Sequence, residues 1–196
     1  MNMRLEKAYV FILVIIFSGC VSVPKESIVE PNQSLSEHQN RITKAILENN
    51  LELADKQYLA LRGEHEESKL ISELILKLCE ALINANEYLL ARYYSNAYIN
   101  DYPSNSGADY AEFLKIKATF LRFKSSGSGQ SLVEQLTQEN QFFLDNYSSS
   151  KYRSELKAMM IEFHQIRKSR NEKIALSYER IGKLKAAEYY RAKNID

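Results

Sequence analysis

The sequence predicts an all-α protein built as an α-solenoid, in which antiparallel helix pairs stack along the chain. From about Ser36 onward, Leu, Ala, Glu and Lys recur at spacings of three and four residues, the pattern of amphipathic helices. The alternation typical of strands is missing, and Pro103 is the only proline beyond that point. Similar helix–turn–helix segments also recur over most of the chain, as stacked repeats require.

The expected helices are separated by residues that favour turns and caps. Asn and Gly accept the left-handed conformation that ends a helix, and Ser caps the helix that follows. Such residues occur at Asn49-Asn50, at Gly63, at 84–86, at Gly182 and in the stretches "DYPSNSG", "SSGSG" and "SSS". We therefore expect helices near 36–48, 51–63, 67–84, 87–101, 108–124, 130–146, 150–168, 171–181 and 184–194.

One helix pair shows the repeat pattern most clearly. In "NANEYLLARYYSNAYINDYP", Tyr88, Ala91 and Pro103 occupy the relative positions found in the tetratricopeptide repeat, a unit of ~34 residues with two antiparallel helices. The alanine allows the paired helices to approach closely, and the proline stops the second helix because it lacks an amide donor. These three residues are predicted to pack or end the repeat.

Two further segments repeat this pattern, "ILENNLELADKQYLAL" and "IALSYERIGKLKAAEYY". The matching residues are Leu51, Ala54 and Tyr58 in the first, and Tyr178, Gly182, Leu184 and Ala187 in the second. Tyr102 and Tyr147 lie in two similar stretches and are 45 residues apart, which indicates a longer unit there. Several matches in register predict stacked tetratricopeptide-like pairs over 36–196.

The N-terminus has the layout of an export signal. Arg4 and Lys7 precede an apolar run over 8–17, and small residues follow it. This run is too short for a membrane-spanning helix, which needs ~20 residues. A basic segment, a short apolar segment and a small-residue exit predict a signal peptide over residues 1–19.

Cys20 is the candidate modification site. "FSGC" resembles the bacterial lipobox, and this resemblance implies cleavage after Gly19 and a diacylglyceryl thioether on Cys20. Val21 follows the cysteine, and the resemblance then favours the outer membrane. The polar, proline-containing residues 20–35 are predicted to be a flexible tether. The alternative is an ordinary secreted protein that is cut nearby and keeps a spare thiol.

Charge and cysteine content exclude several functions. Removal of residues 1–19 would take two of 26 basic and one of 25 acidic residues, leaving 24 of each. This balance gives no support for nucleic-acid binding. Cys79 is the only other cysteine and lies in an apolar helical segment, so we expect a buried thiol and no disulfide framework.

The sequence contains no recognisable arrangement for catalysis, metal binding or a cofactor. His38, His65 and His164 lack the paired spacing of a zinc site on one helix face. His65 lies in "GEHEESK", where we expect a solvated cap. Gly127 and Gly129 have no preceding strand and no Gly-Lys-Ser/Thr, so neither a phosphate loop nor a nucleophile elbow is indicated. We therefore expect a non-enzymatic protein.

Two surface features remain as candidates for protein binding. "HQIRKSRNEK" places Arg167, Lys168, Arg170 and Lys173 around an expected helix break. This run is either a solvated charge cluster or a docking site for an acidic partner. The many tyrosines are expected partly in the core and partly on the concave face, where a solenoid could bind an extended peptide.

Two long segments resemble the BamD (ComL, YfiO) family of outer-membrane lipoproteins. They are "RYYSNAYINDYPSNSGADYAEFLKIKA" and "NQFFLDNYSSSKYRSELKAMMIEFHQIRKSRNEKIALSYERIGKLKAAEYYRAK". The matching positions are Tyr102, Pro103, Tyr110, Ala111, Phe143, Leu144, Tyr147, Ser149, Tyr152, Tyr178, Gly182 and Ala187.

This resemblance implies a lipid-anchored solenoid on the periplasmic face of the outer membrane. It would bind the periplasmic domains of a BamA-like barrel protein, other lipoproteins of the assembly complex, and unfolded barrel substrates. Two alternatives remain. A lipoprotein adaptor of the same fold could serve peptidoglycan or division enzymes or pilot a secretin, and a lipoprotein enzyme could hydrolyse peptidoglycan.

Overall fold

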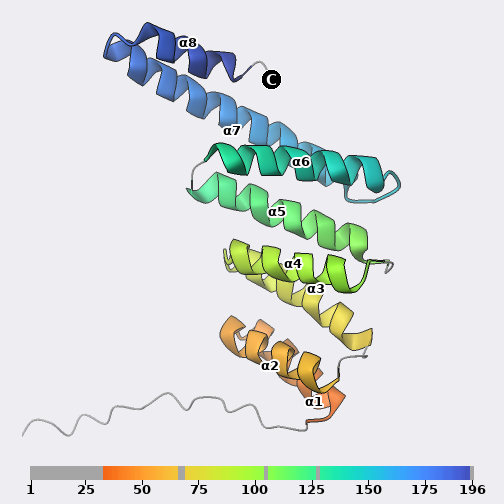
Figure 1. Cartoon of the computed structure of the whole chain (residues 1–196). Coiled ribbons are helices and arrows are strands. Elements are labelled where there is room, and N and C mark those ends of the chain that lie inside the picture. The colour runs from red at the N-terminus through yellow and green to blue at the C-terminus, as the bar shows by residue number, and fades with distance from the viewer. Residues whose placement is uncertain (1–32, 66–68, 104–105, 127–128, 195–196) are drawn as a thin grey trace, which may run out of the picture.

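The structure, a computed structural model, describes residues 33–65, 69–103, 106–126 and 129–194 and confirms the all-α prediction (Figure 1). Within these ranges the chain forms eight helices and no strand. They are α1 (Leu35–Leu47), α2 (Leu51–Glu64), α3 (Lys69–Asn84), α4 (Tyr88–Asp101), α5 (Ala108–Ser126), α6 (Gln130–Asn146), α7 (Arg153–Arg180) and α8 (Leu184–Ala192). The predicted signal peptide, Cys20 and most of the predicted tether lie outside the described residues.

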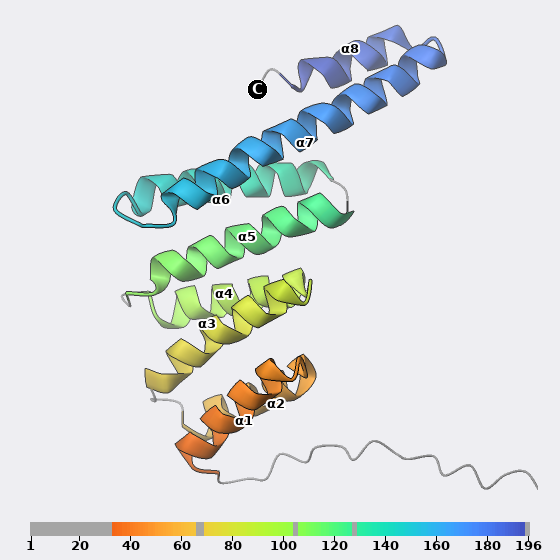
Figure 2. The same ribbon diagram turned by 180° about the vertical axis from the view of Figure 1, so that it is seen from behind.

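The helices stack as successive antiparallel pairs into an elongated solenoid. Figures 1 and 2 show α1 and α2 at one end of the stack and α8 at the other. One hydrophobic core runs continuously through the stack, from Ile42 in α1 to Phe163 in α7. α1 begins with a capping box, in which Ser34 and Glu37 satisfy each other's backbone amides.

Three hairpin turns among the described residues have the same geometry. Asn49, Asn86 and Gly182 adopt the left-handed conformation, with φ of 54°, 66° and 73°. In each turn the next amide donates to the carbonyl five residues back, which is the Schellman pattern of a helix C-terminus. These bonds join Asn50 to Ala45, Glu87 to Leu82 and Lys183 to Tyr178, at 2.8, 2.8 and 2.9 Å.

The residue five positions after each left-handed residue is an alanine. Ala54, Ala91 and Ala187 lie there, and at most 1% of each is exposed. Each lies in the first turn of the second helix of a pair, where its small side chain permits close contact with the first helix. α6 departs from this pattern, because Val133 occupies the corresponding position.

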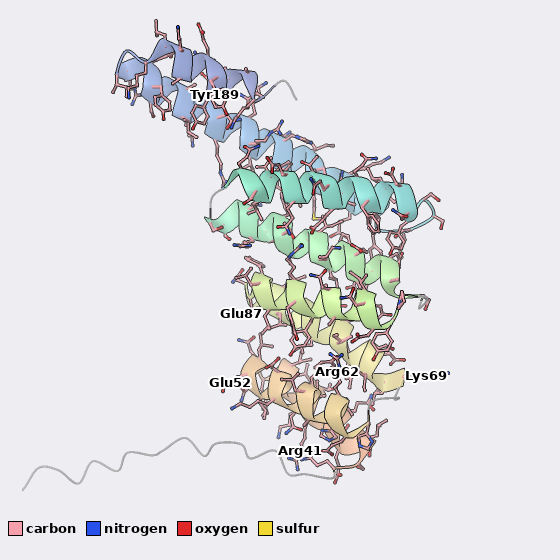
Figure 3. All side chains as sticks on the ribbon, in the orientation of Figure 1. Arg41, Glu52, Arg62, Lys69, Glu87 and Tyr189 are labelled. Carbon is pink, nitrogen blue, oxygen red and sulfur yellow. The ribbon has the colours of Figure 1, made fainter. Side chains whose placement is uncertain are left out.

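Four polar contacts between neighbouring pairs join residues that are 38 or 39 positions apart. Arg62 Nη2 donates to Asp101 Oδ2 over 2.8 Å, and the Tyr94 hydroxyl donates to Asp55, both across 39 residues. Figure 3 shows Arg62 between the first and second helix pairs. Lys117 with Glu155, and Lys124 with Glu162, form equivalent pairs across 38 residues, at 3.1 and 2.6 Å. These four spacings are longer than the ~34 residues of the tetratricopeptide repeat.

The predicted break between helices 150–168 and 171–181 is wrong. α7 runs without interruption from Arg153 to Arg180, over 28 residues. Ser169 and Asn171 are only modestly unfavourable in a helix interior, and no glycine or proline forces a break there. Lys, Arg and Glu around them favour the helix. The basic segment therefore lies on one continuous helix.

The left-handed turn between α7 and α8 provides a stability test. Gly182→Ala should lower the free energy of unfolding by about 1 kcal/mol, because an L-residue is strained in this conformation. Gly63→Ala should instead raise it by about 0.5–1 kcal/mol, because Gly63 lies in α2 and is unfavourable in a helix. Urea unfolding followed by circular dichroism measures both. The same sign for the two variants would contradict this account of the turn.

The close approach of paired helices provides a second test. Ala91→Leu should lower the free energy of unfolding by about 1–3 kcal/mol, because the larger side chain would push α4 away from α3. Ala158→Leu on the exposed face of α7 is the matched control and should change it by less than about 0.5 kcal/mol. Equal effects at the two positions would show that Ala91 is not a close-packing point.

Candidate functional site

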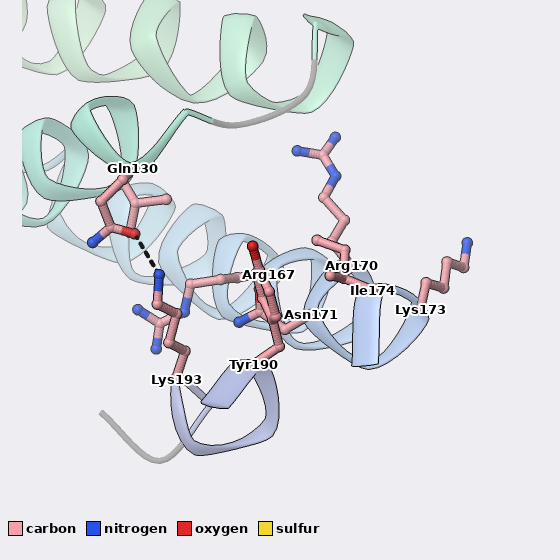
Figure 4. A pocket seen from close by; sticks show the side chains of 9 residues that line it. Gln130, Arg167, Arg170, Asn171, Lys173, Ile174, Tyr190 and Lys193 are labelled. Carbon is pink, nitrogen blue, oxygen red and sulfur yellow. Dashed lines mark hydrogen bonds between the residues drawn. The ribbon is translucent and has the colours of Figure 1, made fainter. Parts of the chain in front are cut away.

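A basic cleft lies where α7 emerges from the stack and pairs with α8. It is bounded by the start of α6, the middle of α7 and the end of α8, and its volume is about 570 Å³ (Figure 4). It is lined by Gln130, Val133, Arg167, Arg170, Asn171, Lys173, Ile174, Tyr190 and Lys193. This lining contains four cations and no carboxylate or histidine.

Arg170 fixes the middle of α7 to the end of α5. Its Nη1 donates to the carbonyl of Phe123 over 3.0 Å, and its Nη2 donates to the carbonyl of Lys124 over 3.1 Å. The guanidinium also lies 4.6 Å from the centre of the Phe123 ring. A cation at the C-terminal end of a helix is favoured by the helix dipole. Arg170 therefore supports the cleft structurally.

Lys193 lies at one end of the cleft, where the end of α8 meets the start of α6. Its Nζ donates to Oε1 of Gln130 over 3.4 Å, as Figure 4 shows, and lies 4.7 Å from the centre of the Tyr189 ring. α8 itself is held on α7 by Arg191, which donates to Glu172 and Glu179. These contacts fix the position of the cleft wall.

Arg167 and Lys173 are the cations available to a ligand. Neither forms an ion pair with any residue that the structure describes. Burial lowers the pKa of the neighbouring His164, and the positive charge of Arg167 lowers it further. Ile174, 38% exposed, adds an apolar contact surface. The cleft can therefore bind carboxylates on a partner protein, with apolar contacts beside them.

The residues predicted to pack the repeat are distributed along the stack and do not form one site. Tyr88 is half-buried, and its hydroxyl donates to Oδ1 of Asn86 over 2.6 Å in the turn. Pro103 is exposed and directly follows Tyr102, the C-cap of α4. Gly182 is exposed in the last turn.

Cys79 is a free thiol in the core of the stack. Its side chain is completely buried, and burial raises its pKa to about 12. The Ser95 hydroxyl lies 3.6 Å from Sγ. A buried thiol that is protonated at neutral pH is not a nucleophile.

A cluster of His38, Glu64 and His65 is a feature that the sequence reasoning missed. It joins the start of α1 to the end of α2. The sequence shows His65 with no second histidine at metal-ligand spacing, and 26 residues separate His38 from Glu64. Only the pairing of α1 with α2 brings these side chains together.

None of the described helices combines the length and hydrophobicity that crossing a membrane requires.

Comparison with known proteins agrees with this architecture. The family model described as YfiO, outer membrane lipoprotein, matches residues 32–194. The outer membrane protein assembly factor BamD of Helicobacter pylori (strain ATCC 700392 / 26695) is 29% identical over 193 residues, which cover 97% of this chain and 87% of that protein. The chain therefore belongs to the YfiO outer membrane lipoprotein family.

Proposed function

We propose that this chain is a non-catalytic lipoprotein scaffold of outer-membrane protein assembly. The observation that carries the proposal is the cleft on the α7–α8 hairpin, with Arg167 and Lys173 unpaired among the described residues. The similarity of the whole chain to a relative named as an assembly factor supports the same function. The cleft would bind acidic segments of the periplasmic domains of a BamA-like barrel protein. Unfolded barrel substrates and other lipoproteins of the complex are further proposed partners.

The arrangement of the stack supports a division between an anchored end and a binding end. We propose that residues 1–19 are removed and that a lipid on Cys20 holds the chain at the periplasmic face of the outer membrane. The described residues begin at Gln33 beside α1, whereas α7 and α8, which line the cleft together with the start of α6, lie toward the other end of the stack (Figures 1 and 2). The continuous core makes the intervening helices a spacer between these two ends.

Charge reversal in the cleft tests this proposal. Arg167→Glu combined with Lys173→Glu should reduce recovery of the barrel partner about tenfold or more, since like charges facing each other at an interface cost several kcal/mol. The measurement is co-purification of the full chain from detergent-solubilised membranes. Lys157→Glu, at an exposed position of α7 outside the cleft, is the matched control and should leave recovery unchanged.

The proposal also predicts which partner is captured. A photoreactive residue replacing Ile174 should crosslink in intact cells to a periplasmic domain of a barrel protein. Depletion of the chain should then lower many outer-membrane barrels at once. Crosslinks to a peptidoglycan or division enzyme, or loss of a single secretin, would favour the alternative adaptor function.

Replacement of the proposed lipid site tests the anchor. Cys20→Ala should leave the helical domain folded but move the protein out of the outer-membrane fraction, because no lipid could be attached. Membrane fractionation and metabolic labelling with a radioactive fatty acid measure this. An unlabelled parent protein, or a Cys20→Ala variant that is still labelled, would contradict the proposed lipidation.

A further inference from the structure

The open end of the α1–α2 pair contains three side chains that can bind a metal. His38 lies in the first turn of α1, Glu64 ends α2, and His65 is the C-cap of α2. One ligand atom from each of the three lies within 4.8 Å of the other two. The two imidazole rings face each other edge to face, with their centres 6.0 Å apart.

Gln33 connects two of the three side chains, Glu64 and His65, through its backbone. Its amide donates to Oε2 of Glu64 over 3.2 Å, and its carbonyl oxygen lies 3.0 Å from Nε2 of His65. The same Glu64 oxygen lies 3.3 Å from Nε2 of His38. The cluster therefore joins the chain just before α1 to the end of α2.

Burial favours a ligand at His38. Its side chain is 0% exposed, and its Nδ1 has no hydrogen-bond partner among the residues that the structure describes. Because a carboxylate only accepts, the contact with Glu64 makes Nε2 the donor, and Nδ1 then carries a lone pair that no described residue uses. The Glu64 side chain, in contrast, is 26% exposed, which leaves a path for an ion from solvent.

Equivalent positions in the other pairs do not carry these ligands. Tyr102 and Tyr147 are the C-caps of α4 and α6, with nearly the same backbone angles as His65 in α2. Each of these three residues donates its amide to the carbonyl four residues back. Ala111 and Leu156 occupy the position of His38 in α5 and α7 and are also fully buried. The stack therefore does not itself require histidines at these positions.

We propose that His38, Glu64 and His65 bind one zinc ion that fastens the start of α1 to the end of α2. Two imidazoles and a carboxylate form a ligand set that zinc uses, whereas Ca²⁺ and Mg²⁺ prefer oxygen ligands. Neighbouring ligands of a tetrahedral zinc ion are about 3.3 Å apart, given metal–ligand bonds of about 2.0–2.1 Å. The three ligand atoms now lie within 4.8 Å of one another, so zinc binding requires them to move closer together. The side chains of Glu64 and His65 are partly exposed and can turn to do so.

Metal titration of the full chain tests this site. The protein, purified in detergent and stripped with EDTA, is titrated with ZnCl₂ in competition with a chromogenic zinc indicator. We expect one zinc ion per chain. Because a metal that binds only the folded state stabilises it, the melting temperature should rise by about 5–10 °C at free zinc about 100-fold above Kd.

Two variants assign the ligands. Glu64→Gln and His65→Gln should each weaken zinc binding at least about tenfold and remove most of the thermal shift, because each removes a ligand. Both positions are partly exposed, so circular dichroism should show unchanged helix content. His164→Gln, on α7 and outside the cluster, is the matched control and should bind zinc as the parent does.

Three results would overturn the proposal. They are the absence of zinc binding by the stripped full chain, parent-like binding by Glu64→Gln and His65→Gln, or an equal loss of binding in the His164→Gln control. None of these readouts depends on a partner protein. The metal site and the proposed scaffold function can therefore fail separately.

Discussion

The architecture depends on the distance between the two helices of each pair, and a short local arrangement sets that distance. A left-handed Asn or Gly ends the first helix, and an alanine five residues later faces it from the second. The Schellman bonds fix the angle of the turn, and the alanine permits close contact. The turn and the alanine lie within a few residues of each other, at 49–54, 86–91 and 182–187. The same local arrangement therefore sets the distance in three helix pairs at different places in the chain.

Where the chain departs from this rule, the stack opens. α6 begins after Gly129 and has Val133 in place of the alanine. α7 then continues over 28 residues and carries α8 away from the earlier pairs (Figure 1). Arg170 fixes α7 to the end of α5 at the point where it leaves the stack. The cleft lies between these departures, with Val133 in its lining, so it results from the interruption of the repeat.

The sequence predicts those features of the structure that depend on neighbouring residues. It does not predict those that depend on contacts between residues far apart in the chain. The turns at Asn49, Asn86 and Gly182 depend on neighbouring residues, and their predicted positions agree with the structure. The expected break near Ser169–Asn171 is wrong, because residues that only slightly disfavour a helix do not end one when the surroundings favour it. The basic segment was visible in the sequence, but its cleft required walls from α6 and α8. The His38–Glu64–His65 cluster required the pairing of two helices, which no local motif reveals.

The repeat itself gives a way to separate structural from functional residues. A position that recurs in several pairs, such as Ala54, Ala91 and Ala187, is explained by packing alone. A position where one pair differs from the others needs another explanation, since the fold tolerates the common residue there. His65 differs from Tyr102 and Tyr147 in this way. The departures occur at both ends of the stack, at the cluster beside α1 and at the cleft beside α8, whereas the regular pairing lies between them. The core that is continuous from Ile42 to Phe163 lies between these two ends, and a solenoid built in this way can hold two binding regions apart.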